Sequence, residues 1–285
     1  MSDIATAAPD ATTETRALSH EGKFIWYELV TSDQDAAIDF YKAVVGYSAA
    51  DFPAPAGDFR YSILTVPGYA PGPESAGGVA GVMALTAEMR AAGGQPGWIG
   101  VIGVGDADEA TRRVAEAGGT VHKEPADIPT VGRFSVVADP GGAVFELLAP
   151  LPMDKHPPEL AADTPGKVGW HELYSSAGEK ASFDFYSRLY GWKTDTEMDM
   201  GAMGKYRIFS KDGVPLGGMM DKPANVPVSA WTFYINVDGI DAATERVKAK
   251  GGEVLMGPME VPNGSWIIQA KDPQGAHFAL VSLKR

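Results

Sequence analysis

Trp26-Tyr27-Glu28-Leu29 returns 144 residues later as Trp170-His171-Glu172-Leu173. Each copy is followed by a run with helical spacing that ends on Phe-Tyr and then on Gly-aromatic: Phe40-Tyr41 and Gly46-Tyr47 in the first copy, Phe185-Tyr186 and Gly191-Trp192 in the second. Repetition at a fixed interval marks a duplicated structural unit. The sequence therefore predicts two copies of one fold within a single chain.

The first half itself contains a smaller repeat. A strand pattern begins at Lys23, Ser32-Asp33 offers an N-cap, and apolar residues recur with helical spacing from Ala37 until Gly46 ends the helix. Three more strands are expected at about 47–52, 60–66 and 79–85. The same β-α-β-β-β order is expected again, from a strand at 98–104, a helix capped by Asp106 and strands at 120–123, 133–138 and 143–148.

The second half repeats this plan, and its later part does so at an interval of 133 residues. Trp231 matches Trp98, Gly251-Gly252 matches Gly118-Gly119, and Asp272-Pro273 matches Asp139-Pro140. Five prolines between 150 and 166 indicate a linker. We therefore predict an α+β fold with a disordered tail at 1–21, a first domain at 22–150, a Pro-rich linker at 151–165 and a second domain at 166–285.

The composition excludes several classes of protein. A net charge of −13 over 285 residues repels phosphate backbones, so nucleic acid is not an expected partner. The absence of cysteine excludes disulfides, thiolate metal sites and cysteine nucleophiles. The first residues lack the pattern of a secretory signal, and no apolar run approaches the ~20 residues that span a bilayer. A soluble cytoplasmic protein without membrane contact is expected.

Three recurring features carry a resemblance to a known family. They are the Asp-Pro-x-Gly turn before the final strand of each half (139–142 and 272–275), the Phe-Tyr…Gly-aromatic helix end, and the doubled β-α-β-β-β order. With these features the chain resembles a tandem member of the vicinal oxygen chelate superfamily, which includes glyoxalase I, bleomycin-resistance proteins and extradiol dioxygenases. The resemblance implies paired units whose strands curve around a cavity, and in metal-dependent members a metal held by inward His, Gln or Glu side chains.

The positions where such metal ligands are expected carry few ligand side chains. In the first half they are Trp26 or Tyr27, Met83, Trp98 or Ile99, and Glu146; in the second half they are Trp170 or His171, Met220 or Asp221, Trp231 or Thr232, and Ala279. A metal site needs three or four converging N or O ligands. The sequence therefore predicts no cofactor, and a divalent metal held by Glu146 or His171 remains an alternative.

Several polar residues are candidates for chemistry. Glu28 and Glu172 share a strand face with their Trp neighbours, so each either anchors a polar group of a ligand or forms a structural hydrogen bond or ion pair, for instance with Arg60 or Arg207. Glu146 has three alternative roles: the remaining ligand of a metal site that has lost its other ligands, a general base, or a polar residue that lines the cavity. His277 shares the face of Ala279 and is either an acid-base group or a surface histidine.

Aromatic residues are frequent on the expected strands, where they form core or hold a planar molecule. The leading interpretation is metal-free binding of a small, partly aromatic organic molecule. Alternatives are a metal-dependent glyoxalase-like lyase or isomerase or a dioxygenase with an atypical ligand set, and an interaction module with filled cavities, so whether the protein is an enzyme stays open. A pseudo-twofold monomer is expected, with a dimer as the alternative. The predicted ligand-binding residues are Trp26, Glu28, Phe59, Tyr61, Trp98, Glu146, Trp170, Glu172, Tyr206 and Trp231.

Overall fold

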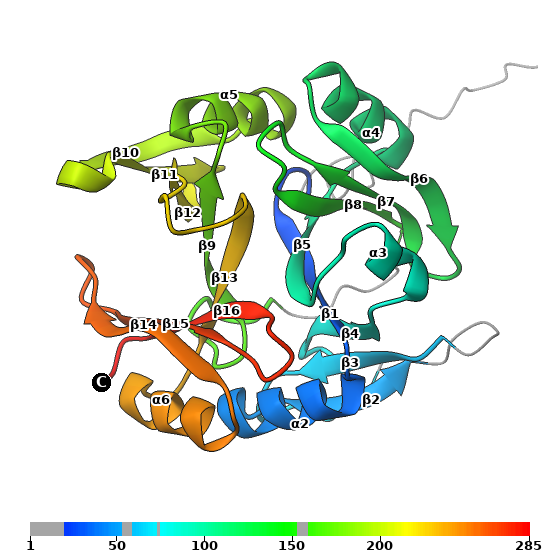
Figure 1. Ribbon diagram of the computed structural model, residues 1–285. Helices are drawn as coiled ribbons and strands as arrows, with labels where there is room; N and C mark the ends of the chain where they lie inside the picture. The colour runs from blue at the N-terminus through cyan, green and yellow to red at the C-terminus, as the bar shows by residue number, and fades with distance from the viewer. Residues whose placement is uncertain (1–19, 53–58, 73–74, 153–158) are drawn as a thin grey trace, which may run out of the picture.

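The computed structural model describes residues 20–52, 59–72, 75–152 and 159–285 (Figure 1). The expected tail at 1–21 falls almost wholly outside the described residues, as does the middle of the expected linker. In the described residues two eight-stranded sheets follow one another along the chain, and helices pack on one face of each. The α+β fold with two tandem halves is therefore confirmed.

Sheet A is formed by the first half, and its strand order is β2-β3-β4-β1-β5-β8-β7-β6. The first β-α-β-β-β unit supplies one half of the sheet and the second unit supplies the other, and the two units meet where β1 and β5 pair antiparallel. The elements are β1 (Phe24–Thr31), α2 (Gln34–Val45), β2 (Ser48–Phe52), β3 (Tyr61–Thr65), β4 (Gly78–Ala84), α3 (Ala87–Ala91), β5 (Gly97–Gly103), α4 (Ala107–Glu116), β6 (Thr120–Ile128), β7 (Gly132–Ala138) and β8 (Val144–Pro150).

Sheet B repeats this topology in the second half, with the order β10-β11-β12-β9-β13-β16-β15-β14. Strands β9 and β13 pair antiparallel at its centre, as β1 and β5 do in sheet A. The elements are β9 (Val168–Ser175), α5 (Glu179–Tyr190), β10 (Lys193–Asp199), the 3₁₀ turn η1 (Gly201–Met203), β11 (Lys205–Lys211), β12 (Val214–Asp221), β13 (Ala230–Asn236), α6 (Ile240–Ala249), β14 (Glu253–Glu260), β15 (Trp266–Lys271) and β16 (His277–Ser282).

Local sequence accounts for the helix boundaries. The side chain of Asp33 accepts a hydrogen bond from the Ala36 amide at 3.0 Å and begins α2, while Gly46, at φ 90°, ends it in the left-handed region. The short helix α3 was not expected from the sequence, and β6 is longer than expected. Among the described residues, none of the helices has both the length and the apolar composition that a membrane span requires.

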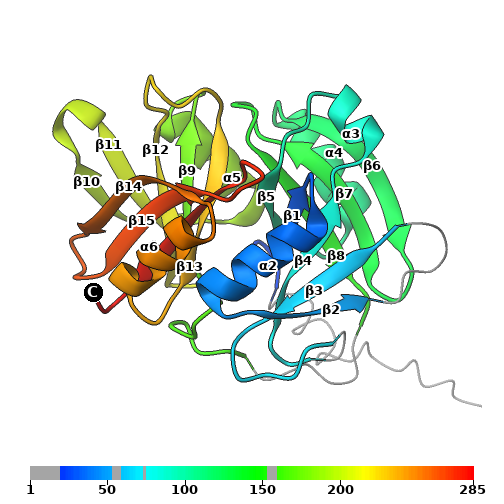
Figure 2. The ribbon, with the colours of Figure 1, turned by 60° about the horizontal axis from the view of Figure 1, so that its bottom comes forward.

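The two halves pack through their helix-bearing faces. Helix α2 of the first half lies beside α6 of the second, and α4 lies beside α5 (Figures 1 and 2). The Tyr41 hydroxyl donates to Asp272 across this interface at 3.2 Å, and Tyr186 donates to Asp139 at the same distance. The helix-end tyrosine of each half thus binds the Asp-Pro turn of the other half, which explains why the sequence repeats both motifs.

The first repeated tetrapeptide also meets its copy at this interface. The Tyr27 hydroxyl lies 2.7 Å from Nε2 of His171, the residue 144 positions later in the chain. Phe24 stacks on the His171 ring at 4.2 Å, because a register shift between Phe24 and Trp26 changes the face that Phe24 occupies. Simple strand alternation predicts that Phe24 shares a face with Trp26 and Glu28, and the irregularity in β1 places it on the other face instead.

Candidate functional site

The opposite face of sheet A, which we call its open face, carries a hydrogen-bonded cluster. The indole Nε1 of Trp26 donates to the Tyr61 hydroxyl at 2.9 Å, and that hydroxyl donates to Oε1 of Glu28 at 2.7 Å. Trp26 and Glu28 come from β1 and Tyr61 from β3, so the cluster spans the first unit of the sheet. The Trp26 and Tyr61 side chains are partly exposed and Glu28 is buried.

Gly81 makes room for this cluster. A Cβ atom at Gly81 would overlap the Tyr61 hydroxyl and the Oε2 atom of Glu28. We expect Gly81→Ala to displace Tyr61 and to lower the free energy of unfolding by about 1–3 kcal/mol, as other overpacked buried sites do. Urea unfolding measures this change. Gly78→Ala is the control, because its Cβ would meet its nearest neighbour, Ile63, at an ordinary 3.4 Å. Equal stability of the two variants would contradict the packing described.

A row of cross-strand neighbours extends the open face into the second unit. Its members pair in register from β6 to β1 in the order Lys123, Val136, Glu146, Val101 and Trp26. Glu146 is thus placed one strand from β5 and two from β1. The row brings a cation, a carboxyl group and an indole onto one face.

The two carboxyl groups of the open face influence each other. Burial raises the pKa of Glu28 well above its ordinary value, and the nearby Glu146 raises it further, while hydrogen bonds from Tyr61 and Trp26 oppose the shift. Burial raises the pKa of Glu146 from 4.5 to about 7, with Lys123 acting in the opposite direction. Oε2 of Glu28 is buried and has no hydrogen-bond partner among the described residues. Such an orphaned group calls for an explanation.

In sheet B the equivalent carboxylate has hydrogen-bond donors from two further side chains. Oε2 of Glu172 accepts hydrogen bonds from the Tyr234 hydroxyl at 2.8 Å and from Nε2 of Gln269 at 3.0 Å. The same Gln269 nitrogen also donates to Tyr174 at 3.2 Å. Burial raises the pKa of Glu172, and the surrounding hydroxyl and amide donors, Tyr206 included, lower it. Trp170 donates to the Tyr206 hydroxyl at 3.0 Å, which reproduces the contact between Trp26 and Tyr61.

Among the positions at which the two sheets differ, five lie in or next to this row of cross-strand neighbours. Sheet B carries Met256 at the position of Lys123 and Gln269 at the position of Val136. It carries Ala279 at the position of Glu146 and Tyr234 at the position of Val101. Tyr174 takes the position of Val30. Tyr234, Ile267 and Ala279 form a buried apolar cluster on sheet B, to which the described part of sheet A has no counterpart. The open face of sheet B is therefore filled by its own side chains.

The remaining predicted ligand residues divide between the two faces of the sheets. Phe59 stacks on Tyr61 at 6.4 Å and is 48% exposed, at the edge of the sheet A cluster. Trp98 and Trp231 lie on the helix-bearing faces instead, where their indole nitrogens donate to Tyr41 at 2.8 Å and to Tyr186 at 3.0 Å. These two tryptophans form core between the halves and lie outside both carboxyl clusters.

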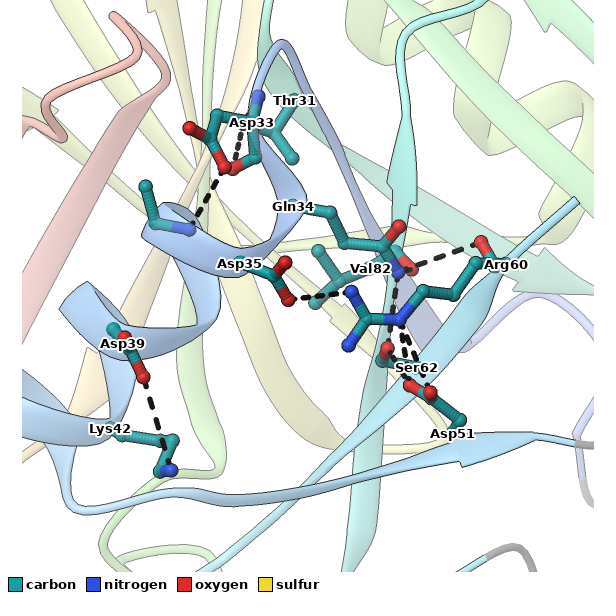
Figure 3. Close-up of polar contacts among 11 residues, drawn as sticks. Thr31, Asp33, Gln34, Asp35, Asp39, Lys42, Asp51, Arg60, Ser62 and Val82 are labelled. Atoms are coloured by element: carbon teal, nitrogen blue, oxygen red, sulfur yellow. Dashed lines mark hydrogen bonds and ion pairs between the residues drawn. The ribbon is translucent and has the colours of Figure 1, made fainter.

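Neither arginine considered as a partner for the carboxyl groups reaches them. Arg60 pairs with Asp35 at 2.5 Å and with Asp51 at 3.0 Å, beside the buried Gln34 that ties α2 to the sheet (Figure 3). Arg207 pairs with Glu179 and Glu197. The alternative of an ion pair between Glu28 or Glu172 and these arginines is thus wrong, because both guanidinium groups lie on the helix side.

Both histidine candidates lie away from the carboxyl clusters. His171 is buried between the halves, where its Nδ1 lies 2.6 Å from the Leu216 carbonyl and burial lowers its pKa to about 4. His277 is exposed at the start of β16, beside Lys271. A histidine held neutral by burial, with both ring nitrogens within hydrogen-bond reach of protein groups, is poorly placed to bind a metal ion.

A surface depression of about 410 Å³ lies elsewhere, between β10 and β11. It is lined by Glu197, Met198, Asp199 and Lys205, and three of these four side chains are charged. Because three of its four lining side chains are charged and none is aromatic, we do not place the site there. The open face of sheet A combines apolar side chains with two perturbed carboxyl groups, and it is the candidate site.

A family model agrees with the fold and topology. The model described as "Glyoxalase/Bleomycin resistance protein/Dioxygenase superfamily" matches residues 23–147 and 179–280. The chain belongs to this superfamily. It is 30% identical over 266 residues to "Putative glyoxylase CFP32" of Mycobacterium tuberculosis, covering 93% of this chain and 97% of that protein. It is also 30% identical over 268 residues to "Anthracycline biosynthesis protein DnrV" of Streptomyces peucetius, covering 91% and 92%.

Solved structures with the same fold are more distant. The Mn(II)-bound glyoxalase from Novosphingobium aromaticivorans has a TM-score of 0.62 at 16% identity, covering 93% of this chain and 83% of that one. The 2,2',3-trihydroxybiphenyl 1,2-dioxygenase from Sphingomonas wittichii has a TM-score of 0.62 at 11% identity, covering 92% and 90%. At these identities the likeness shows the superfamily fold alone.

The residues of sheet A do not fit a metal ion of the kind that the superfamily implies. Three of its four expected ligand positions carry Trp26, Met83 and Ile99, none of which supplies a suitable N or O ligand. Groups of three or more His, Asp or Glu that could hold a metal are absent from the part of the chain that the structure describes. The side chains of sheet A therefore account for its chemistry without a metal ion.

Proposed function

We propose that this superfamily member binds a small, partly aromatic organic molecule on the open face of sheet A without a metal ion. The single observation that carries the proposal is the Glu28 carboxyl group, buried beside Glu146 with one oxygen unsatisfied among the described residues. A buried polar atom without a partner is costly, so a site that keeps one gains free energy when a ligand supplies the partner. Trp26 and Tyr61 provide the adjacent aromatic surface.

The names of two relatives are compatible with such a ligand. One is named for anthracycline biosynthesis and another as a putative glyoxylase, and both align over more than nine-tenths of this chain. We propose a ligand of the same general kind, namely an organic molecule that combines a ring with hydroxyl or carbonyl groups. Lys123, at the edge of the row that contains Glu146, is positioned to interact with an electron-rich group of the ligand.

Substitution of Glu28 tests the proposal. The ligand is any compound that stabilises the wild-type protein. We expect Glu28→Leu to lower the affinity for this compound at least tenfold, because both acceptor oxygens are lost. Glu172→Leu is the matched control, and its binding constant should be unchanged because Glu172 belongs to the filled sheet. Calorimetric titration in the presence of EDTA measures the binding constants of both variants. If Glu28→Leu does not fold, Glu28→Gln is measured in its place. Unchanged binding in both Glu28 variants would contradict the proposal.

Acid-base catalysis without a metal is the second candidate function. The specific observation is the pKa of about 7 at Glu146, which lets this carboxyl group accept or donate a proton near neutral pH. The measurement is incorporation of deuterium from D₂O into the C–H bonds of a bound compound. If the wild type accelerates this exchange, Glu146→Gln should abolish it. If the wild type shows no exchange, acid-base catalysis is ruled out and binding is the one candidate function left.

A further inference from the structure

The equivalent glutamates of the two sheets, Glu28 and Glu172, differ in their hydrogen-bond partners. In sheet B, Glu172 accepts hydrogen bonds from a phenol and an amide, both supplied by the protein. In sheet A, Glu28 keeps only the Tyr61 hydroxyl, and its second oxygen lacks a partner within the described residues. The sheets have the same register, so the missing donors can be located by comparing equivalent positions.

The missing donors correspond to two valines. Tyr234 pairs with Trp170 and Ala279, as Val101 pairs with Trp26 and Glu146. Gln269 pairs with Ala279, as Val136 pairs with Glu146. Sheet A therefore lacks the phenol and the amide at the two strand positions from which sheet B supplies them.

From this correspondence we infer that the ligand of sheet A is a hydroxylated aromatic molecule whose O–H donates to Glu28, and that Tyr234 and Gln269 occupy the equivalent place in sheet B as an internal substitute. The inference rests on the proposed function and names the substrate class. It also explains why sheet B carries alanine at the position of Glu146, because the small Ala279 side chain leaves space for the Tyr234 ring.

Glu28 must turn its carboxyl group to receive such a ligand. Its Oε2 atom now lies against Gly81, whereas the Oε2 atom of Glu172 faces Tyr234 and Gln269. The last torsion of a glutamate side chain is broad, so the inference requires only that the carboxyl group turn about this torsion. The Tyr61 hydroxyl, held by Trp26, stays available to either oxygen.

A transplant of the sheet B residues tests the inference without any ligand. The variant Val101→Tyr/Val136→Gln/Glu146→Ala should place a phenol and an amide beside Glu28. Its matched control, Val101→Phe/Val136→Gln/Glu146→Ala, differs by one hydroxyl group. We expect the tyrosine variant to melt about 2–4 °C above the phenylalanine variant. Equal melting temperatures, or a lower value for the tyrosine variant, would overturn the inference while leaving the proposed function intact.

A pair of probe compounds tests the same inference through binding. We expect 2-naphthol to bind the wild type at least tenfold more tightly than 2-methoxynaphthalene, which has the same ring but no O–H donor. The transplanted variant should bind neither compound. Equal affinities of the wild type for the two compounds would overturn the donor requirement alone. Failure of both compounds to bind the wild type at millimolar concentration would count against the inference and the proposed function together.

Discussion

Replacing Asp272 by alanine is expected to lower the free energy of unfolding by about 3–5 kcal/mol, one of the two largest effects that the structure predicts. Asp272 is only 4% exposed, and its Oδ1 accepts hydrogen bonds from the amides of Gln274 and Ala276, each at 2.9 Å. Its other oxygen accepts from the Tyr41 hydroxyl of the opposite half. Alanine would remove the acceptor of all three donors, two of which are buried.

The measurement is equilibrium unfolding in urea, followed by tryptophan fluorescence. Asp272→Asn is the matched variant, because it keeps one acceptor oxygen, and it should lose less than half as much stability. Asp139→Ala should behave like Asp272→Ala, since Asp139 holds its own turn through Gly141 and Ala143 and accepts from Tyr186. A loss below about 1 kcal/mol in either alanine variant would show that the paired turns do not hold the halves together.

The second large effect is a dependence of stability on pH that originates at Glu146. Its pKa in the folded protein is about 7, above the 4.5 of the unfolded chain. Below pH 4.5 both states are protonated, so the contribution of this group to stability is fully present. As the pH rises to 7 the unfolded state loses its proton first, and about 2–3 kcal/mol of stability is lost. Above the folded pKa the loss is complete.

Glu146→Gln removes this titration. We expect the variant to lose about 2–3 kcal/mol less stability than the wild type between pH 4.5 and pH 8, and to be the more stable protein at pH 8. Urea unfolding at a series of pH values measures the difference. Glu124→Gln, at an exposed position on β6, two strands away from β8, is the control and should follow the wild type. A variant curve parallel to that of the wild type would contradict the burial of Glu146.

The repeats made the architecture predictable from the sequence. The Asp33 cap, the Gly46 stop and the two Asp-Pro turns each specify a local structure, and their recurrence at fixed intervals specifies the duplication. Helix α3 escaped prediction because its five residues are too few for a periodic pattern. The position of Phe24 escaped prediction because a register shift within a strand leaves no mark in simple alternation.

The candidate site was only partly predictable. Glu28, Tyr61 and Glu146 were identified as candidates from strand alternation and from the spacing after the Asp-Pro turn. Trp98 and Trp231 were grouped with them because composition alone does not tell which face of a strand packs on a helix. The replacement of Val101 and Val136 by Tyr234 and Gln269 was missed, although aligning the halves at the interval of 133 residues would have revealed it.

Binding by metal-stripped protein tests the central claim most directly. Hydroxylated aromatic compounds would be titrated into EDTA-treated protein by calorimetry, and the titration repeated with excess Mn(II). We predict that a compound binds with a stoichiometry of one per chain and that Mn(II) leaves its affinity unchanged, because the site in sheet A is formed by Glu28, Glu146 and their aromatic neighbours. Binding that occurs only with Mn(II), or two equivalent sites per chain, would contradict the account.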